Sequence, residues 1–397
     1  MQNFIDILSR FPHRRSGSEY NFQAVHAIRD IFESFGLKTK LESFRVPGTM
    51  FSRIIFSIVF LFAIFFLMKD FYVLSLVLYS LILFALWGEL NFSFNLLGVF
   101  FPGHYTFNIE AVFNPNPNPN PNPNPNQNQN KKVIVIAHHD SPKTGLLYHI
   151  ADRLAPKQAK LPGVLSRMFF IPFMAAVTLG VLIIIRPLEI SNLLIVVLTA
   201  IAIFIISLIL LILLNMIMSK NSPGANDNGS GILVLMELAR RFSQDKSKNV
   251  SFTLLSTGAE EVGLTGIKNY IRNHFDLNKE NTLFINFECL GGGELHWATG
   301  EYYLKKLDYP QKGIEIIKDM ENRNLIPNLP KVPLISPTDA TPLANNGFNV
   351  VTLIGLNDSV VPSNYHTAGD TFDKLDQSLL LKATDLVESI IHAWCFG

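Results

Sequence analysis

Four long apolar stretches interrupt an otherwise mixed chain, and they fall into two pairs. The stretches are residues 54–68, 71–87, 168–185 and 190–218. At about 1.5 Å per residue, helices of the first pair would be about 22–26 Å long, which is short for a bilayer core of about 30 Å, whereas the second pair is longer. We expect two transmembrane helical hairpins, 54–88 and 168–219. Buried core helices or a re-entrant segment are the alternative for the first.

The rest of the chain alternates between helical and extended patterns. Helices are expected at 21–35, where Gly36 is a natural stop, and at 232–242, 264–275 and 379–394, and strands at 38–46, 107–113, 132–137, 250–256, 283–287 and 350–356. Near-continuous apolar strands are typical of a sheet that is covered on both faces. The pattern predicts an α/β fold with a mixed, mostly parallel central sheet flanked by helices and interrupted by the two hairpins.

Residues 114–130 form an Asn-Pro repeat that ends in Asn-Gln. Alternating prolines cannot enter a helix or supply the donors of a strand ladder, so we expect a solvated loop with polyproline character. Because this low-complexity tract lies between two strand-like runs, we interpret it as the tip of an expanded hairpin.

Composition narrows the class of protein. Charged residues make up 16% of the chain, and the two apolar regions contain only four of them. The net charge of +1 excludes a strongly basic nucleic-acid-binding protein. Two cysteines are too few for a disulfide scaffold, and the first residues lack the pattern of a cleavable signal peptide. We therefore expect a membrane protein that carries a water-soluble domain.

Five short segments collect carboxylates and imidazoles, and most of them directly follow a predicted strand. They are 137–141 (AHHDS), 224–231 (GANDNGSG), 258–263 (GAEEVG), 286–289 (NFEC) and 364–370 (NYHTAGD). In an open α/β sheet, the ligand crevice lies at the carboxyl ends of the strands. Each segment alone is typical of an ordinary turn or a solvated edge. Together they supply nitrogen and oxygen ligands that suit two zinc ions bridged by one carboxylate.

With these motifs in this order, the sequence resembles the di-zinc exopeptidases that include aminopeptidase Y, bacterial secreted leucyl aminopeptidases and glutamate carboxypeptidase. The resemblance covers about residues 10–50 and 106–397, and the segment 15–19 (RSGSE) is similar to the segment that opens that family's domain. It implies that His138 and Glu288 bind one zinc ion. Glu261 and His366 would bind the other, and Asp227 would bridge the two.

The resemblance also implies roles for neighbours of these ligands. Glu260 would be the general base, and Asp140 would orient the imidazole of His138. His139 occupies a variable position and would face the other way along the strand.

Two further family positions bear on the site. The position of Glu288 is commonly an aspartate in the family, so the carboxylate is displaced by one methylene. Thr338-Asp339 resembles a shorter family signature near the active site. Tyr365 either donates a hydrogen bond to the tetrahedral intermediate or only packs beside its neighbouring ligand.

The implied function is a membrane-bound, zinc-dependent exopeptidase that acts on peptides, with an aminopeptidase favoured and a carboxypeptidase left open. A glutaminyl cyclase shares the fold but works with one zinc ion. An inactive receptor or scaffold on the same fold is the non-enzymatic alternative. The full ligand set and the adjacent Glu260 favour the peptidase.

The expected site constrains how the chain crosses the bilayer. Because His138 and Asp227 bind the same zinc ion, the insertion between them crosses an even number of times. The two hairpins then give four spans. The peptidase domain consists of residues 1–53, 89–167 and 220–397, all on one side of the membrane.

The charges flanking the spans predict which side this is. Lysine and arginine residues near the span ends lie mostly on the side of the domain, among them Arg45, Arg53 and Lys220. This bias predicts a cytoplasmic catalytic domain. The sequon Asn228-Gly229-Ser230 beside the bridging ligand also argues against exposure to a lumen.

Overall fold

The computed structural model describes residues 1–90, 95, 98–114, 131–145, 170–188, 192–244, 251–302, 306–334, 336–358 and 360–396. They form two compact units. Unit 1 comprises Met1–Phe44, Tyr105–Pro162 and Lys220–Gly397, and unit 2 comprises Arg45–His104 and Gly163–Ser219. Apart from Asn114, the Asn-Pro tract lies outside the described residues.

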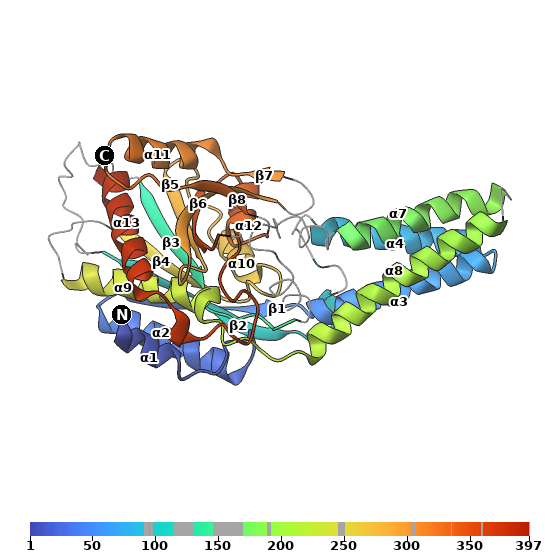
Figure 1. Ribbon diagram of the computed structural model, residues 1–397, viewed down its shortest axis with the longest axis horizontal. Coiled ribbons are helices and arrows are strands. Elements are labelled where there is room, and N and C mark those ends of the chain that lie inside the picture. The colour runs from blue at the N-terminus through green and yellow to red at the C-terminus, as the bar shows by residue number, and fades with distance from the viewer. Residues whose placement is uncertain are drawn as a thin grey trace. The chain divides into compact units, whose positions relative to one another are not determined.

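A nine-stranded sheet forms the centre of unit 1 (Figure 1). Its strands are β1 (Lys38–Val46), β2 (His104–Phe113), β3 (Lys132–His138), β4 (Phe252–Thr257), β5 (Thr282–Glu288), β6 (Glu294–Tyr302), β7 (Lys306–Asp308), β8 (Lys331–Leu334) and β9 (Asn349–Leu356). Their order is β1-β2-β4-β3-β5-β9-β6-β7, with β8 also paired to β6. The central strands β4, β3, β5 and β9 are parallel, whereas β2, β6 and β7 pair antiparallel. The mixed α/β sheet expected from the sequence is confirmed.

The expected hairpin around the Asn-Pro tract is wrong. β2 pairs antiparallel with β4, and β4 pairs in parallel with β3, so β4 lies between the two strands that flank the tract. Five of the six residues of β4 are buried. A strand that is buried in this way needs a partner on each edge for its backbone groups, and this requirement overrides pairing between neighbours in sequence.

Helices cover the sheet of unit 1. They are α1 (Gln2–Leu8), α2 (Glu19–Ser34), α9 (Ser230–Gln244), α10 (Thr265–Asn273), α11 (Gln311–Asn322), α12 (Ala340–Asn345) and α13 (Gln377–Phe396). α9 and α13 pack on β3 and on each other, while α11 and α12 pack on β9. Local signals fix the ends of α2, because the Ser18 side chain accepts the N–H of Asn21 and Gly36 adopts a φ of 80° after the last turn.

Unit 2 contains four apolar helices. They are α3 (Thr49–Met68), α4 (Tyr72–Leu90), α7 (Phe170–Ile185) and α8 (Asn192–Met218). Because α3 begins at Thr49 rather than at residue 54, it has 20 residues and a length of about 30 Å. The helices share a core of their own, which includes Phe60, Ile82 and Leu179.

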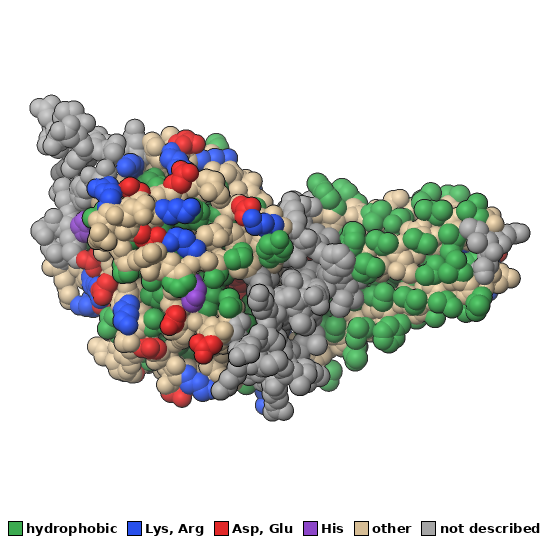
Figure 2. Space-filling model, turned by 45° about the horizontal axis from the view of Figure 1, so that its top comes forward, with side chains coloured by type: hydrophobic (Ala, Val, Ile, Leu, Met, Phe, Trp, Pro, Cys, Tyr) green, Lys and Arg blue, Asp and Glu red, His purple; other side chains and the backbone are tan. Residues whose placement is uncertain are grey.

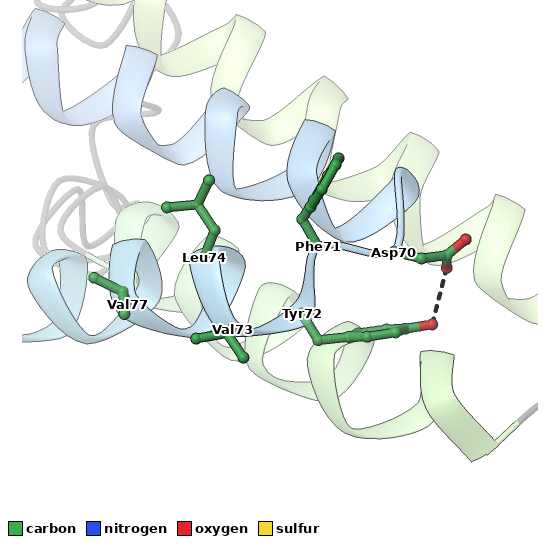
Figure 3. A pocket seen from close by; sticks show the side chains of 6 residues that line it. All are labelled: Asp70, Phe71, Tyr72, Val73, Leu74 and Val77. Atoms are coloured by element: carbon green, nitrogen blue, oxygen red, sulfur yellow. Dashed lines mark hydrogen bonds between the residues drawn. The ribbon is translucent and has the colours of Figure 1, made fainter.

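The turns of the two hairpins in unit 2 are joined by polar contacts. Arg186, after α7, lies 3.2 Å from Asp70, between α3 and α4. The Tyr72 hydroxyl donates to the same carboxylate at 2.9 Å. Both residues line a pocket together with Phe71, Val73, Leu74 and Val77 (Figure 3). These contacts join the turns of the two hairpins.

The aromatic cluster at one end of the sheet gives a test of the core. Phe242 of α9 is fully buried, with its ring centroid 4.5 Å from that of Phe252 and 5.7 Å from that of Phe113. We expect Phe242→Ala to lower the free energy of unfolding by about 3–5 kcal/mol, because it removes buried apolar area and leaves a cavity. Phe275, which is 83% exposed, is the matched control. Phe275→Ala should change the free energy of unfolding by about 0.5 kcal/mol or less. Denaturant titrations of the two variants measure this quantity. Equal effects of the two variants would contradict this packing.

Candidate metal centre

The parallel strands bring three of the five chemistry-bearing segments to one edge of the sheet. β3 ends at His138, β5 ends at Glu288, and Glu260 and Glu261 follow the end of β4. β4, β3 and β5 are direct neighbours with the same direction, so their carboxyl ends lie together. This is the edge at which open α/β sheets bind ligands.

Loops supply the other two segments. Asp227 lies just before α9, in a loop that begins after Gly224, whose φ of 66° favours glycine. The Asp370 carboxylate accepts the backbone N–H groups of Asn226 and Asp227 at 2.6 and 3.1 Å. His366 comes from the loop after β9.

The side chains form two groups that share one carboxylate. In the first group, His138 Nε2 lies 3.4 Å from both Asp227 Oδ1 and Glu288 Oε1. In the second, His366 Nε2 lies 3.2 Å from Asp227 Oδ2 and 3.5 Å from Glu261 Oε2. Asp227 thus offers a different oxygen to each group.

These spacings fit zinc. Ligand atoms about 2.0–2.1 Å from a tetrahedral zinc ion lie about 3.3 Å from one another. Within each group, all three candidate ligand atoms lie within 4.8 Å of one another. Glu288 Oε2 is buried and has no hydrogen-bond partner among the described residues, as expected for an atom that faces a cation. The structure therefore brings together all five ligands expected from the sequence, in two groups that fit zinc ions.

Asp140 and Glu260 lie against these groups. Asp140 Oδ1 is 3.6 Å from His138 Nδ1, and its two oxygens accept the backbone N–H groups of Glu260 and Glu261 at 3.1 and 3.2 Å. Glu260 also belongs to a third possible ligand group, with His138 and Glu261. His139, by contrast, forms a hydrogen bond with Ser256 Oγ at 2.9 Å.

The crowding of carboxylates in a buried site shifts their pKa values. Burial raises the pKa of both Glu260 and Glu261, and neighbouring carboxylates add to the effect, while His138 opposes it. Burial favours a lower pKa for His138, but Glu260 and the carboxylates around it outweigh burial and raise this pKa. For Asp227, hydrogen bonds from His138 and His366 outweigh burial and lower the pKa.

Asp370 had no role in the sequence prediction, whereas Asp339 and Tyr365 had been singled out there. Asp370 lies at the end of the fifth segment, but nothing in the sequence shows that it binds the backbone of the Asp227 loop. Asp339 Oδ2 accepts a hydrogen bond from the Thr257 hydroxyl, and burial raises the pKa of Asp339 to about 7. The Tyr365 ring lies 4.1 Å from that of His366, so Tyr365 at least packs beside this ligand.

The raised pKa of His138 leads to a prediction about zinc binding. Zinc binds the deprotonated imidazole, so a group whose pKa is raised loses a proton when zinc binds. We therefore expect proton release on zinc binding, and an affinity that falls as the pH is lowered from about 8 to 6. Calorimetry in two buffers of different protonation enthalpy measures this release. His138→Ala should reduce it, whereas His296→Ala, outside the site, should leave it unchanged. Heats that do not depend on the buffer would contradict the prediction.

Comparisons with known proteins find similarity to peptidases. The sequence pattern of peptidase family M28 matches residues 214–391. Aminopeptidase YwaD of Bacillus subtilis is 28% identical over 175 residues, which cover 43% of this chain and 38% of YwaD. The matched part is therefore well under half of that relative.

Several solved structures share the fold. An aminopeptidase from Aneurinibacillus sp. strain AM-1 has a TM-score of 0.54 at 17% identity, covering 98% of this chain and 92% of its own. A leucine aminopeptidase precursor from Bacteroides thetaiotaomicron has a TM-score of 0.55 at 13% identity, with coverage of 98% and 94%. The glutaminyl cyclase of the same organism also gives 0.55 at 13% identity, with coverage of 98% and 95%. Residues 214–391 thus match peptidase family M28, and the chain has an α/β fold like that of a zinc-dependent exopeptidase.

Proposed function

We propose that the chain is a membrane-anchored zinc exopeptidase of the aminopeptidase type. The observation that carries this proposal is the pair of three-ligand groups that share Asp227, with the carboxylate of Glu260 beside them. The family match and the similarity to aminopeptidase YwaD support the choice of reaction. Aminopeptidase rather than carboxypeptidase activity rests on that similarity alone.

The protein's own residues divide the work of hydrolysis. His138 and Glu288 would hold one zinc ion, Glu261 and His366 the other, and Asp227 both. When bound, the zinc pair lowers the pKa of water and polarises the scissile carbonyl.

Glu260 then serves as the general base. Its pKa is raised by burial, which suits a carboxylate that takes a proton from the attacking water and later gives it to the leaving amine. Asp140 keeps the His138 ring oriented through Nδ1 and holds the backbone of Glu260 through its N–H group.

The role of Glu260 is tested by Glu260→Gln, which keeps the shape of the side chain but cannot accept the proton. We expect both zinc ions to remain bound and kcat to fall by about 10²–10⁴-fold. The matched control is Glu294→Gln, at an exposed glutamate of β6, which should keep wild-type turnover. Zinc content by mass spectrometry and hydrolysis of unblocked peptides give the two readouts. Near-wild-type turnover by Glu260→Gln would rule out this base.

A glutaminyl cyclase is the second candidate, because such enzymes are as similar in fold as the aminopeptidases. The two complete ligand groups favour two zinc ions over one. Incubation with peptides that begin with glutamine separates the candidates, since cyclisation releases ammonia and aminopeptidase action releases a free amino acid. An inactive scaffold would do neither.

The helices of unit 2 support anchoring in a membrane. Two of them, α4 over Tyr72–Glu89 and α8 over Asn192–Met218, contain windows long and apolar enough to cross a bilayer, and two shorter apolar segments are Ser52–Met68 and Pro172–Leu188. Hydrophobic side chains cover the visible surface of these helices, whereas unit 1 carries charges of both signs (Figure 2). Val73, Phe204 and Leu211 are each more than 60% exposed. An apolar surface of this extent is unfavourable in water and favourable in lipid.

We further propose that both hairpins span the bilayer and that unit 1 is cytoplasmic. The apolar outer surface of the helices and the lysine and arginine bias near their ends support this arrangement. The Arg53–Glu89 ion pair, with a distance of 2.5 Å, joins the two helix ends of the first hairpin on the side of these charges.

Membrane fractionation tests the anchoring. We expect the full chain to stay in the membrane pellet after extraction with alkaline carbonate and to be released by detergent, because four apolar helices are buried in the hydrocarbon core. Release by carbonate alone would contradict spanning helices. In sealed, right-side-out vesicles, protease should digest unit 1 only after permeabilisation. Digestion of intact vesicles would instead place unit 1 outside the cytoplasm.

A further inference from the structure

Arg14 is a fully buried cation beneath the candidate metal centre. Its guanidinium donates to three backbone carbonyl oxygens, from Nε to His139 at 2.9 Å, from Nη1 to Pro223 at 2.9 Å and from Nη2 to Gly224 at 2.5 Å. A buried charge is costly unless polar partners surround it. The three carbonyl oxygens are these partners, so the guanidinium is held in place by the backbone groups that it binds.

The three acceptors lie in the two loops that carry ligands of the first group. His139 directly follows His138, while Pro223 and Gly224 begin the loop that presents Asp227. The backbone N–H of Arg14 also donates to Ser141 Oγ at 2.9 Å, and Ser141 Oγ donates to the Ser222 carbonyl at 3.0 Å. One residue therefore links both loops through its side chain and its backbone.

The space around the guanidinium leaves little freedom. A Cβ atom added to Gly224 or Gly229 would lie 3.3 or 3.2 Å from Arg14 Nη2. The Phe372 ring covers the guanidinium, with its centroid 5.7 Å from Arg14 Cζ. Arg14 and Asp370 thus bind the same loop, Arg14 through its carbonyl groups and Asp370 through its N–H groups.

The charge of Arg14 also matters. Burial lowers its pKa to about 10, and the carboxylates of Asp370, Asp140 and Asp227 oppose this shift, so the side chain is a cation at neutral pH. Arg14 therefore offsets part of the repulsion among these carboxylates. A lysine at this position would keep the charge but could not reproduce the planar fork that reaches three separate acceptors.

We propose that Arg14 is a positioning residue for the metal centre, which holds the loops of His138 and Asp227 at the spacing that zinc requires. This inference rests on the zinc site of the proposed function but not on the reaction performed there. Arg14 is not one of the candidate ligands, and it acts through the backbone groups that it binds.

The test compares Arg14→Met and Arg14→Lys with Arg10→Met, at an exposed arginine of the same segment. Zinc affinity is measured by chelator competition, and ligand geometry by the visible absorption of the cobalt-substituted protein, both without substrate. We expect Arg14→Met to bind zinc about 10–100-fold more weakly, as for other residues that orient ligands, and to change the cobalt spectrum. Arg14→Lys should lie between Arg14→Met and the wild type, and Arg10→Met should match the wild type.

Each outcome bears on the proposal. Wild-type zinc affinity and an unchanged cobalt spectrum in Arg14→Met would overturn it. Should Arg14→Met fail to fold, Arg14→Lys decides, and wild-type behaviour of that variant would overturn the proposal equally. If the wild type binds two zinc ions but hydrolyses no peptide, the proposed function fails while the role of Arg14 stands. If the wild type binds no zinc, both fail.

Discussion

Mutual repulsion among buried carboxylates is the physical problem around which unit 1 is built. Asp140, Asp227, Glu260, Glu261 and Glu288 approach one another at the edge of the sheet, where burial alone favours their neutral forms. A site of this kind persists only where cations and hydrogen-bond donors face the acids. Part of this compensation comes from the two imidazoles and the buried Arg14. Another part comes from the backbone N–H groups that donate to Asp140 and Asp370. A pair of divalent ions would supply most of the rest, which explains why the fold and the metal chemistry belong together.

The sequence predicted the elements whose signals are local. The helix at α2 carries its own cap and stop, and the central strands are continuous apolar runs, so both were found close to their observed bounds. Most of the segments that carry the candidate ligands follow directly on predicted strands, and the resemblance to a known family assigned the individual ligands within them. β6 was missed because Gly300 and the buried Glu301 interrupt its apolar pattern. The position of β4 between β2 and β3 was missed as well, because strand order depends on contacts far apart in the chain.

The supports of the site were harder to predict than its ligands. Arg14 and Asp370 lie more than 350 residues apart in the sequence and bind the same loop. Neither has a local pattern that distinguishes it from a surface residue. Only the tertiary structure shows that the guanidinium meets carbonyl groups and the carboxylate meets N–H groups. Glu301 is a similar case, since its carboxylate accepts hydrogen bonds from Thr338 and Tyr309 and so holds the turn before Asp339.

Unit 1 is discontinuous in sequence, and this affects how the site can come into being during synthesis. Arg14 leaves the ribosome with the first stretch, His138 with the second, and the remaining ligands only after α8. A growing chain therefore has both of its hairpins made before it can complete either ligand group that contains Asp227. Under the proposed function, no peptide can be cut until both hairpins have been made.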